Sequence, residues 1–267
     1  MRRMRAAREG VMATGKFVWF ELLTTDVDAA KAFYTEVIGW KTQKMDGPMD
    51  YTVWSVGERG VGGLMTLPEP AKAAGAPPHW LGHVEVPDAD ATAKQATELG
   101  GNILVPVQEM PDVGRFALIQ DPQGAVLSVY TPANPMEGGG TGSGDFTWNE
   151  LNTTDYEAAW TFYSELFGWQ ATESFDMGPE HGTYFMFKRD GGERTLGGMS
   201  NAANAEHIHT HWLYYITVDD IAAAVERVKS NGGKLVNGPM EVPGGELVAQ
   251  CEDPQGAAFA LHQPAKQ

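Results

Sequence analysis

The chain has few basic residues, one cysteine and no long apolar run. It carries 19 Lys and Arg against 35 Asp and Glu, and the net charge of −16 repels nucleic acid and anionic membranes. The single Cys251 excludes an internal disulfide, and its place in the strand-like LVAQCED indicates a packed thiol. No apolar run could cross a bilayer, and the basic start MRRMRAAREGVM lacks the apolar segment of a secretory signal. We therefore expect a cytoplasmic protein with no nucleic-acid or membrane partner.

What the chain does contain is enough apolar material for one or two buried cores. Of its 267 residues, 42% are hydrophobic and 10% aromatic, as in a globular protein. The regular spacing of apolar residues that is typical of strands and helices begins only near Lys16. We therefore expect residues 1–15 to form a disordered N-terminal extension, or Met12 to be the true start.

The sequence is written twice. FVWFELLTTDVDAAKAFYTEVIGW (17–40) and FTWNELNTTDYEAAWTFYSELFGW (146–169) agree at more than half of their positions without a gap. The likeness returns at HWLGHVEV against HWLYYITV and at DPQGAVLSVY against DPQGAAFALH, with a shift that grows only from 129 to 132 residues. A segment rich in Gly, Pro and Ser lies between the copies. These features predict two domains, 16–131 and 145–264, joined by a linker at 132–144.

Each copy shows the same order of strand and helix signals. An alternating strand leads to Thr-Thr-Asp, a helix-capping sequence, and then to a helix that ends at Gly-Trp. Hairpin strands follow, and the strand–helix pattern then begins again, so each domain is predicted to be βαβββ repeated twice. The DPQG segments at 121–124 and 253–256 place Pro and Gly where a tight turn needs them. We interpret them as architecture and not as chemistry.

These motifs, in this order and repeated, resemble the vicinal oxygen chelate superfamily. That superfamily includes glyoxalase I, extradiol dioxygenases, fosfomycin-resistance enzymes and bleomycin-binding proteins. The resemblance extends from about Lys16 to Gln263. It implies an α+β fold of tandem glyoxalase-like domains, each made of two βαβββ modules that form a curved sheet around a cleft. The fold alone does not fix an activity, because it hosts unlike functions.

Where members of this superfamily bind a metal, the resemblance places the ligands on the first strand of each module and on the last strand. The matching positions here are Trp19, Leu81 and Ser128 in the first copy, and Trp148, Leu213 and Ala260 in the second. None of these is a usual ligand of a divalent metal. We therefore expect the superfamily's metal to be absent from both domains, with no other cofactor implied.

The HIHTHW stretch at 207–212 is the other candidate for a metal site. On a strand, His207, His209 and His211 would share one face. His211 matches His79 of the first copy, but the other two histidines have no counterpart there. A solvated, His-rich loop is the favoured interpretation, and a native metal site stays open as an alternative.

Two residues beyond the vacant ligand positions, each copy repeats a set of polar side chains. They are Glu21, His83 and Tyr130 in the first copy and Glu150, Tyr215 and His262 in the second. If the first and last strands of a module are parallel neighbours, His83 should hydrogen-bond Tyr130 and Tyr215 should hydrogen-bond His262. Three interpretations remain open: a self-satisfied structural layer, the polar end of a ligand site, or a shifted metal site that uses a Glu and a His.

Aromatic residues around this layer suggest the walls of a site for a planar molecule. The candidates are Trp19, Trp54 and Trp80 in one half and Trp148, Phe185 and Trp212 in the other. We predict a metal-free protein that binds a small planar or hydrophobic molecule. The predicted ligand-binding residues are Trp19, Glu21, His83, Tyr130, Trp148, Glu150, Tyr215 and His262.

Two other functions remain open. The first is a lyase, isomerase or oxygenase that uses a shifted metal site or a glutamate base, with Glu21 and Glu150 as catalytic candidates. The second is a non-catalytic interaction protein. The sequence is compatible with either a monomer or a homodimer.

Overall fold

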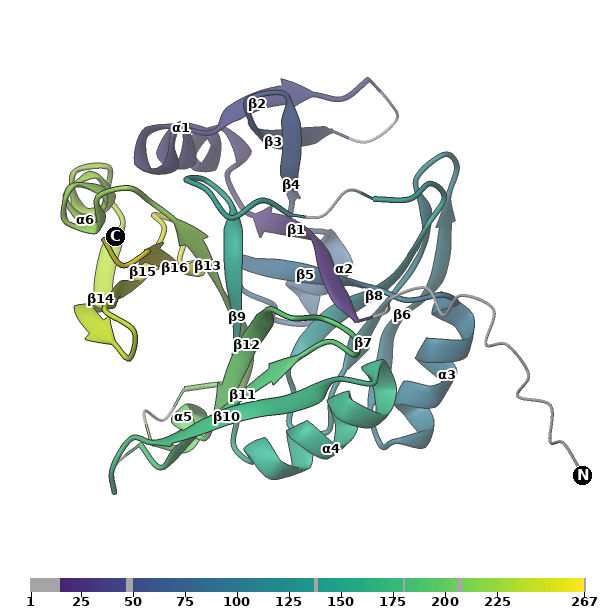
Figure 1. The fold of residues 1–267 in the computed structure, drawn as a ribbon. Helices are drawn as coiled ribbons and strands as arrows, with labels where there is room; N and C mark the ends of the chain where they lie inside the picture. Colours follow the sequence, from purple (N-terminus) through teal and green to yellow (C-terminus); the bar gives the residue numbers. More distant parts are fainter. Residues whose placement is uncertain (1–14, 47–49, 137–138, 180, 206–207, 267) are drawn as a thin grey trace, which may run out of the picture.

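The computed structural model describes residues 15–46, 50–136, 139–179, 181–205 and 208–266. The first half of the chain forms one eight-stranded sheet, ordered β2-β3-β4-β1-β5-β8-β7-β6 (Figure 1). Its strands are β1 (Lys16–Thr24), β2 (Lys41–Lys44), β3 (Tyr51–Val56), β4 (Arg59–Thr66), β5 (His79–Glu85), β6 (Asn102–Met110), β7 (Gly114–Gln120) and β8 (Val126–Pro132). Its helices are α1 (Val27–Ile38), α2 (Glu69–Ala73) and α3 (Ala89–Glu98).

The second half repeats this sheet in the order β10-β11-β12-β9-β13-β16-β15-β14. Its strands are β9 (Phe146–Asn152), β10 (Gln170–Asp176), β11 (Thr183–Lys188), β12 (Thr195–Ser200), β13 (His211–Thr217), β14 (Lys234–Val242), β15 (Glu246–Glu252) and β16 (Ala258–Gln263). Its helices are α4 (Tyr156–Phe167), α5 (Ala202–Ala205) and α6 (Ile221–Ser230). Within the described ranges, no helix is long and apolar enough to span a membrane. Residues 1–14 of the N-terminal extension predicted at 1–15 lie outside the described residues, and their disorder stays a prediction. Gly15 is ordered, since its N–H donates to the Glu85 carbonyl at 2.9 Å.

In each sheet the two modules meet along their first strands. β1 pairs antiparallel with β5, and β9 pairs antiparallel with β13. Within a module the first and last strands are parallel neighbours, as in β1 with β4 and β5 with β8. This arrangement confirms the predicted α+β fold of tandem glyoxalase-like units. It also shows that the modules pair within each half of the chain.

The predicted helix caps are present in both copies. The Asp26 and Asp155 carboxylates each accept the backbone N–H three residues further on, at 3.0 Å, which satisfies a free donor of the first helical turn. α1 ends at Gly39 with φ 87°, and α4 ends at Gly168 with φ 69°. Both glycines adopt the left-handed conformation that an L side chain would strain.

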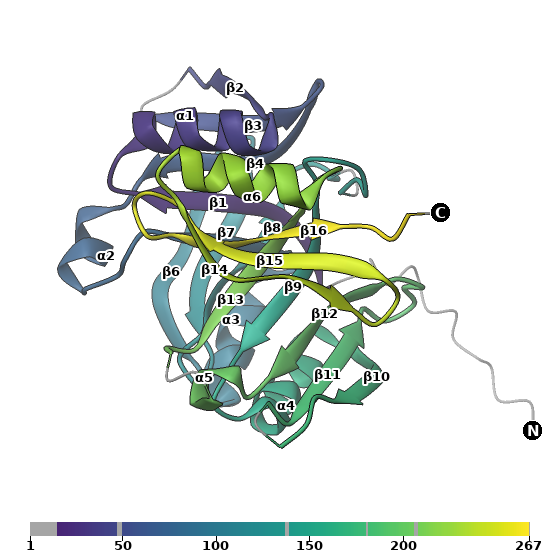
Figure 2. The same ribbon diagram turned by 90° about the vertical axis from the view of Figure 1, so that its left-hand side faces the viewer.

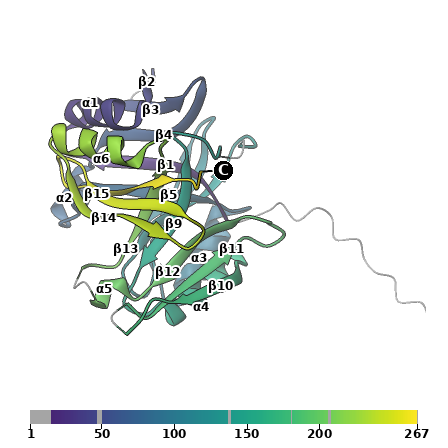
Figure 3. The same cartoon turned by 60° about the vertical axis from the view of Figure 1, so that its left-hand side comes forward.

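The helix-covered sides of the two sheets share one hydrophobic core. Phe20 of β1 stacks on Phe146 of β9 with ring centroids 4.0 Å apart. α1 lies beside α6, and α3 lies beside α4 on the opposite side of the molecule (Figures 1 and 2). Figure 3 shows α6 lying over β14 and β15, next to α1. Cys251 is part of this core, where burial raises the pKa of its thiol to about 12. The division into domains at 16–131 and 145–264 stays a prediction.

Both DPQG segments form the predicted tight turns. The backbone N–H of Gly124 donates to the Asp121 carbonyl, and that of Gly256 donates to the Asp253 carbonyl, at 3.1 and 3.0 Å. One carboxylate oxygen of each aspartate accepts two further backbone N–H groups of its own turn at 2.9 Å. The aspartate therefore holds its turn from both the main chain and the side chain.

The other carboxylate oxygen of each turn binds the opposite half of the chain, which the sequence interpretation missed. The Tyr163 hydroxyl of α4 donates to Asp121 at 2.9 Å, and the Tyr34 hydroxyl of α1 donates to Asp253 at 3.2 Å. We call this reciprocal pair of hydrogen bonds the tyrosine latch. The indole N–H groups of Trp80 and Trp212 donate in turn to Tyr34 and Tyr163. The turns therefore connect the halves as well as the strands.

Equivalent positions of the two copies meet where β5 faces β13. Gly82 matches Tyr214 in the repeat, and its backbone N–H donates to the Tyr214 hydroxyl at 2.8 Å. A Cβ at Gly82 would lie 2.6 Å from that hydroxyl. One position must therefore be small because the other is large.

Candidate functional site

The sheet side opposite the helices carries the predicted polar residues in both halves. Because side chains alternate along a strand, Phe20 and Leu22 of β1 enter the shared core while Trp19 and Glu21 point to the other side. We call this side of the first sheet the first polar face, and the equivalent side with Trp148 and Glu150 the second polar face.

A Trp–Tyr–Glu chain of hydrogen bonds lies on each polar face. The Trp19 indole N–H donates to the Tyr51 hydroxyl at 2.9 Å, and Tyr51 hydrogen-bonds the Glu21 carboxyl group. On the second face Trp148 donates to Tyr184 at 2.8 Å, and Tyr184 donates to Glu150 at 2.9 Å. The sequence interpretation missed both tyrosines. The sequence signal that could have identified them is a tyrosine near the start of the first hairpin strand in both copies.

Glycine on the intervening strand allows each tyrosine to reach its glutamate. Gly63 of β4 lies between β3 and β1, where it is paired with Glu21, and Gly198 of β12 is paired with Glu150 in the same way. A Cβ at Gly63 would lie 1.9 Å from the Tyr51 hydroxyl, and a Cβ at Gly198 would lie 2.3 Å from the ring of Tyr184. Each tyrosine therefore crosses a strand that has no side chain at that point.

Burial sets the protonation behaviour of these groups. It raises the pKa of Glu21, and the hydrogen bond from Tyr51 partly offsets this rise. The pKa of Tyr51 is also raised, by burial and by the neighbouring Glu21 charge. Burial and the Glu150 carboxylate raise the pKa of Tyr184. A buried carboxyl group with a raised pKa can exchange a proton with a bound molecule.

Glu150 has further partners that Glu21 does not have among the described residues. The Tyr215 hydroxyl donates to Glu150 at 2.9 Å, and the Gln250 amide donates to it at 3.4 Å. The matching residues in the first half are His83 and Leu118. Burial lowers the pKa of His83 to about 4, so its imidazole is neutral at pH 7.

The predicted His–Tyr hydrogen bonds across the last strands are wrong. β5 and β8 pair His83 with Ser128 and Glu85 with Tyr130, so His83 and Tyr130 are diagonal neighbours. Their ring centroids are 6.1 Å apart, and the Tyr130 hydroxyl instead donates to the Val113 carbonyl at 2.7 Å. The register predicted between β5 and β8 therefore differs from the observed one by two residues.

The same displacement occurs in the second half. β13 and β16 pair Tyr215 with Ala260 and Thr217 with His262. His262 Nδ1 lies 3.1 Å from the Thr147 hydroxyl, and its Nε2 lies 3.1 Å from a Glu246 carboxylate oxygen. His262 therefore contacts Thr147 and Glu246, and it is a diagonal neighbour of Tyr215 instead of its direct cross-strand partner.

Most of the predicted aromatic walls lie elsewhere. Trp19 and Trp148 are half-buried on the polar faces. Trp54, Trp80 and Trp212 occupy alternate strand positions and are buried in the shared core. Phe185 also points away from the polar face, since its neighbour Tyr184 lies on it, and packs 4.8 Å from Trp160. The prediction of these four as walls of a site is wrong, because their side chains point to the other side of the sheet.

The metal-ligand positions of the superfamily that the sequence resembles hold no metal donors of the usual kind. Leu81 and Leu213 are buried in small apolar clusters on the polar faces. Among the described residues, no group of three His, Cys, Asp or Glu side chains could hold a metal ion. These positions therefore do not fit the superfamily's metal.

The histidine-rich stretch is only partly described. The rings of His209 and His211 lie 5.0 Å apart, and His211 Nδ1 lies 2.9 Å from the His209 carbonyl oxygen. His207 lies outside the described residues. The interpretation of HIHTH as a solvated loop stays a prediction.

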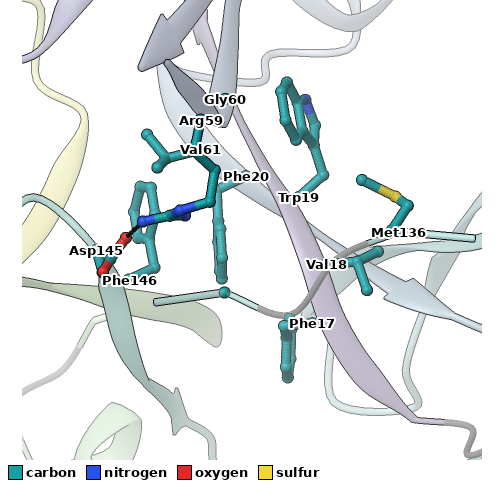
Figure 4. Close-up of a pocket in the computed structure, with 11 residues that line it drawn as sticks. Phe17, Val18, Trp19, Phe20, Arg59, Gly60, Val61, Met136, Asp145 and Phe146 are labelled. Atoms are coloured by element: carbon teal, nitrogen blue, oxygen red, sulfur yellow. Dashed lines mark hydrogen bonds and ion pairs between the residues drawn. The ribbon is translucent and has the colours of Figure 1, made fainter. Parts of the chain in front are cut away.

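A small cavity of about 120 Å³ lies beside the first polar face, between β1 and the segment that connects the two halves (Figure 4). Arg59 points across it to form an ion pair with Asp145. The ring of Trp19 forms part of its wall. Pockets for drug-sized ligands usually measure about 300–1,000 Å³, so this cavity is too small for a polycyclic molecule.

Comparison with known proteins places this geometry in a family. The model of the Glyoxalase/Bleomycin resistance protein/Dioxygenase superfamily matches residues 16–129 and 146–261. The protein CFP32 of Mycobacterium tuberculosis, whose name marks it as a provisional glyoxylase, is 31% identical over 256 residues, which are 93% of this chain and 95% of that one. The anthracycline biosynthesis protein DauV of a Streptomyces species is 27% identical over 274 residues, with 93% of each chain covered.

A solved structure shows the same fold at much lower identity. A variant of 4-hydroxymandelate synthase from Streptomyces coelicolor superposes with a TM-score of 0.64 at 15% identity, over 96% of this chain and 95% of that one. The family model covers most of both halves, and the similarity to CFP32 runs through almost the whole chain. The chain therefore belongs to the Glyoxalase/Bleomycin resistance protein/Dioxygenase superfamily.

Proposed function

We propose that the protein binds a small planar or hydrophobic molecule on its polar faces, without the metal that many members of its superfamily use. Trp19 and Trp148 provide aromatic surface for the ligand. Glu21, His83 and Tyr130 on the first face, and Glu150, Tyr215 and His262 on the second, provide its polar contacts. The proposed partner is thus a small molecule, with the chain acting as a monomer or homodimer in the cytoplasm.

The Trp–Tyr–Glu chain carries this proposal. It recurs in both halves, and in both a glycine on the intervening strand leaves room for the tyrosine to cross it. Core packing alone does not require a carboxyl group there, since burying one costs free energy. Half-buried indole rings next to hydrogen-bonding groups are typical of sites for flat ligands. The similarity to DauV, an anthracycline biosynthesis protein, supports a small-molecule ligand.

The first experiment is calorimetric titration with two planar probes, 2-naphthol and 1,4-dihydroxyanthraquinone. Wild-type protein should bind at least one of them, and the double variant Trp19→Ala, Trp148→Ala should lose that binding. Trp160→Ala is the matched control, because Trp160 is also half-buried but packs against Phe185 away from the polar faces. Binding that survives the double variant, or no binding to wild type, would contradict the proposal.

Metal content is tested on the same untagged protein, purified without metal-affinity steps. Elemental analysis should find no metal in amounts near one per chain. Near-stoichiometric Fe, Mn, Ni or Zn would overturn the metal-free proposal and support a shifted site that uses a Glu and a His.

A second candidate function is acid–base catalysis, which the raised pKa of Glu21 favours. A carboxylate in this setting could remove a proton from an acidic C–H group of a bound substrate. If so, Glu21→Gln should abolish turnover while the folded structure and probe binding persist. If Glu21→Gln keeps the wild-type rate, Glu21 is not the catalytic base. Glu150→Gln, measured in the same assay, tests the glutamate of the second polar face in the same way.

A further inference from the structure

We infer that the ligand site is confined to the first polar face, where a hydroxyl group of the ligand takes the place that the Tyr215 hydroxyl fills on the second face. This inference rests on the proposed function and narrows it. It also assigns the second polar face a structural role.

The two glutamates differ in how far their hydrogen-bonding capacity is used. Glu150 accepts from Tyr184, Tyr215 and Gln250, at 2.9, 2.9 and 3.4 Å. Within the described residues, the side-chain hydrogen bond of Glu21 comes from Tyr51. The second face therefore completes the environment of its carboxylate from within the chain, and the first face does not.

The first face also holds buried polar atoms that have no partner among the described residues. They are His83 Nε2 and the Ser128 hydroxyl, on side chains that are 9% and 0% exposed. His83 and Ser128 are paired on β5 and β8, so both side chains point to the first polar face. On the second face the same positions hold Tyr215, which is hydrogen-bonded, and Ala260, which has no polar side-chain atom. His262 Nε2 of the second face also makes no hydrogen bond to the described residues, but it lies 3.1 Å from a Glu246 carboxylate oxygen. Unpartnered buried polar atoms cost free energy, so these two favour a bound polar group.

Side-chain length explains what the first face is missing. Tyr215 is diagonal to Glu150 across β13 and β9, and its hydroxyl spans that separation to reach the carboxylate. His83 is diagonal to Glu21 in the same way across β5 and β1. An imidazole is shorter than a phenol, so the His83 side chain extends less far towards Glu21 than the Tyr215 side chain extends towards Glu150. A hydroxyl that donates to Glu21 and bonds His83 would complete the first face.

The burial pattern agrees with this assignment. Glu21, Trp19 and Phe116 are half-buried on the first face, whereas Glu150 is 8% exposed. The ring of Phe116 lies 6.4 Å from that of His83, and Trp19 is paired with His83 across β1 and β5. A ligand can reach Glu21 from solvent and then His83 by displacing these rings. The aromatic rings of Trp19 and Phe116 beside these polar groups favour an aryl hydroxyl compound as the ligand.

The test is calorimetric titration of the full chain with 2-naphthol and with 2-methoxynaphthalene, which has no hydroxyl donor. Wild type should bind one 2-naphthol per chain, and should bind the methoxy compound about tenfold or more weakly because it cannot donate to Glu21. His83→Tyr gives the first face the residue of the second face and should abolish binding. His209→Tyr is the matched control, because the exposed His209 lies outside both faces. It should bind like wild type.

Circular dichroism establishes that His83→Tyr is folded. If it is not, His83→Phe removes the imidazole nitrogens and should weaken 2-naphthol binding about tenfold or more. Two 2-naphthol molecules per chain, equal affinity for both probes, or full binding by a folded His83 variant would overturn the inference and leave the proposed function standing. Absence of all probe binding to wild type would overturn both.

Discussion

Substituting alanine for Gly63 should displace Tyr51 and break the hydrogen-bond chain of the first polar face. The added Cβ would lie 1.9 Å from the Tyr51 hydroxyl and 2.4 Å from the ring carbon that bears it, so the tyrosine must move. Overpacking of this kind costs about 1–3 kcal/mol, and each lost hydrogen bond adds about 1 kcal/mol. Since Tyr51 bonds both Trp19 and Glu21, we expect the free energy of unfolding to fall by about 3–5 kcal/mol.

A double-mutant cycle isolates the contact between Gly63 and Tyr51. The free energy of unfolding is measured by urea denaturation for wild type, Gly63→Ala, Tyr51→Ala and the double variant. Without the tyrosine side chain the new Cβ has nothing to displace, so Gly63→Ala should be nearly neutral in that background. The coupling energy should therefore approach the whole cost of Gly63→Ala in the wild-type background, about 3 kcal/mol or more. A cost for Gly63→Ala that is the same in both backgrounds, within about 0.5 kcal/mol, would refute the proposed packing.

Three further predictions concern protonation and the tyrosine latch. Because burial raises the pKa of Glu21 in the folded state, that state binds the proton more tightly, and stability should fall as pH rises from about 4 towards the raised pKa. Glu21→Gln should remove this fall in pH-dependent urea denaturation, and an unchanged slope would contradict it. His83, with its pKa lowered to about 4, should show a neutral imidazole at pH 5.5 by NMR. Its contribution to stability should be lost as pH falls from about 6.5 to 4; a protonated ring at pH 5.5 would disprove its burial. Tyr163→Phe should lower the free energy of unfolding by about 1–3 kcal/mol, because the buried Asp121 loses a donor from the other half. An unchanged urea midpoint would show that the latch adds no stability.

The local features of the fold followed from the sequence, because each depends on neighbouring residues. The capping role of Asp26, the helix end at Gly39 and the DPQG turn at 121–124 were predicted and are present. The repeat made the order of strands and helices evident twice. The partner of the turn was missed, since Tyr163 lies 42 residues from Asp121 and no local pattern connects them.

The candidate site was predicted only in part, because its geometry depends on register between strands. Because side chains alternate between the two sides of a strand, the sequence alone was enough to predict on which side of each sheet Glu21 and Glu150 lie. The hydrogen bond between His83 and Tyr130 failed because β5 and β8 pair two residues out of the expected register. Tyr51 was missed because it reaches Glu21 only over the bare backbone of Gly63 on the strand between them.

The contact between Gly82 and Tyr214 limits what the two halves can do apart. Equivalent positions that touch lie near an approximate twofold axis, where a symmetric dimer of one half would bring each residue against its own copy. Two copies of the first half would then face each other with glycine on both sides and leave a hole, while two copies of the second would bring two tyrosines into collision. The fit at this contact therefore depends on the two halves being different, and each half is complementary to the other and not to a second copy of itself.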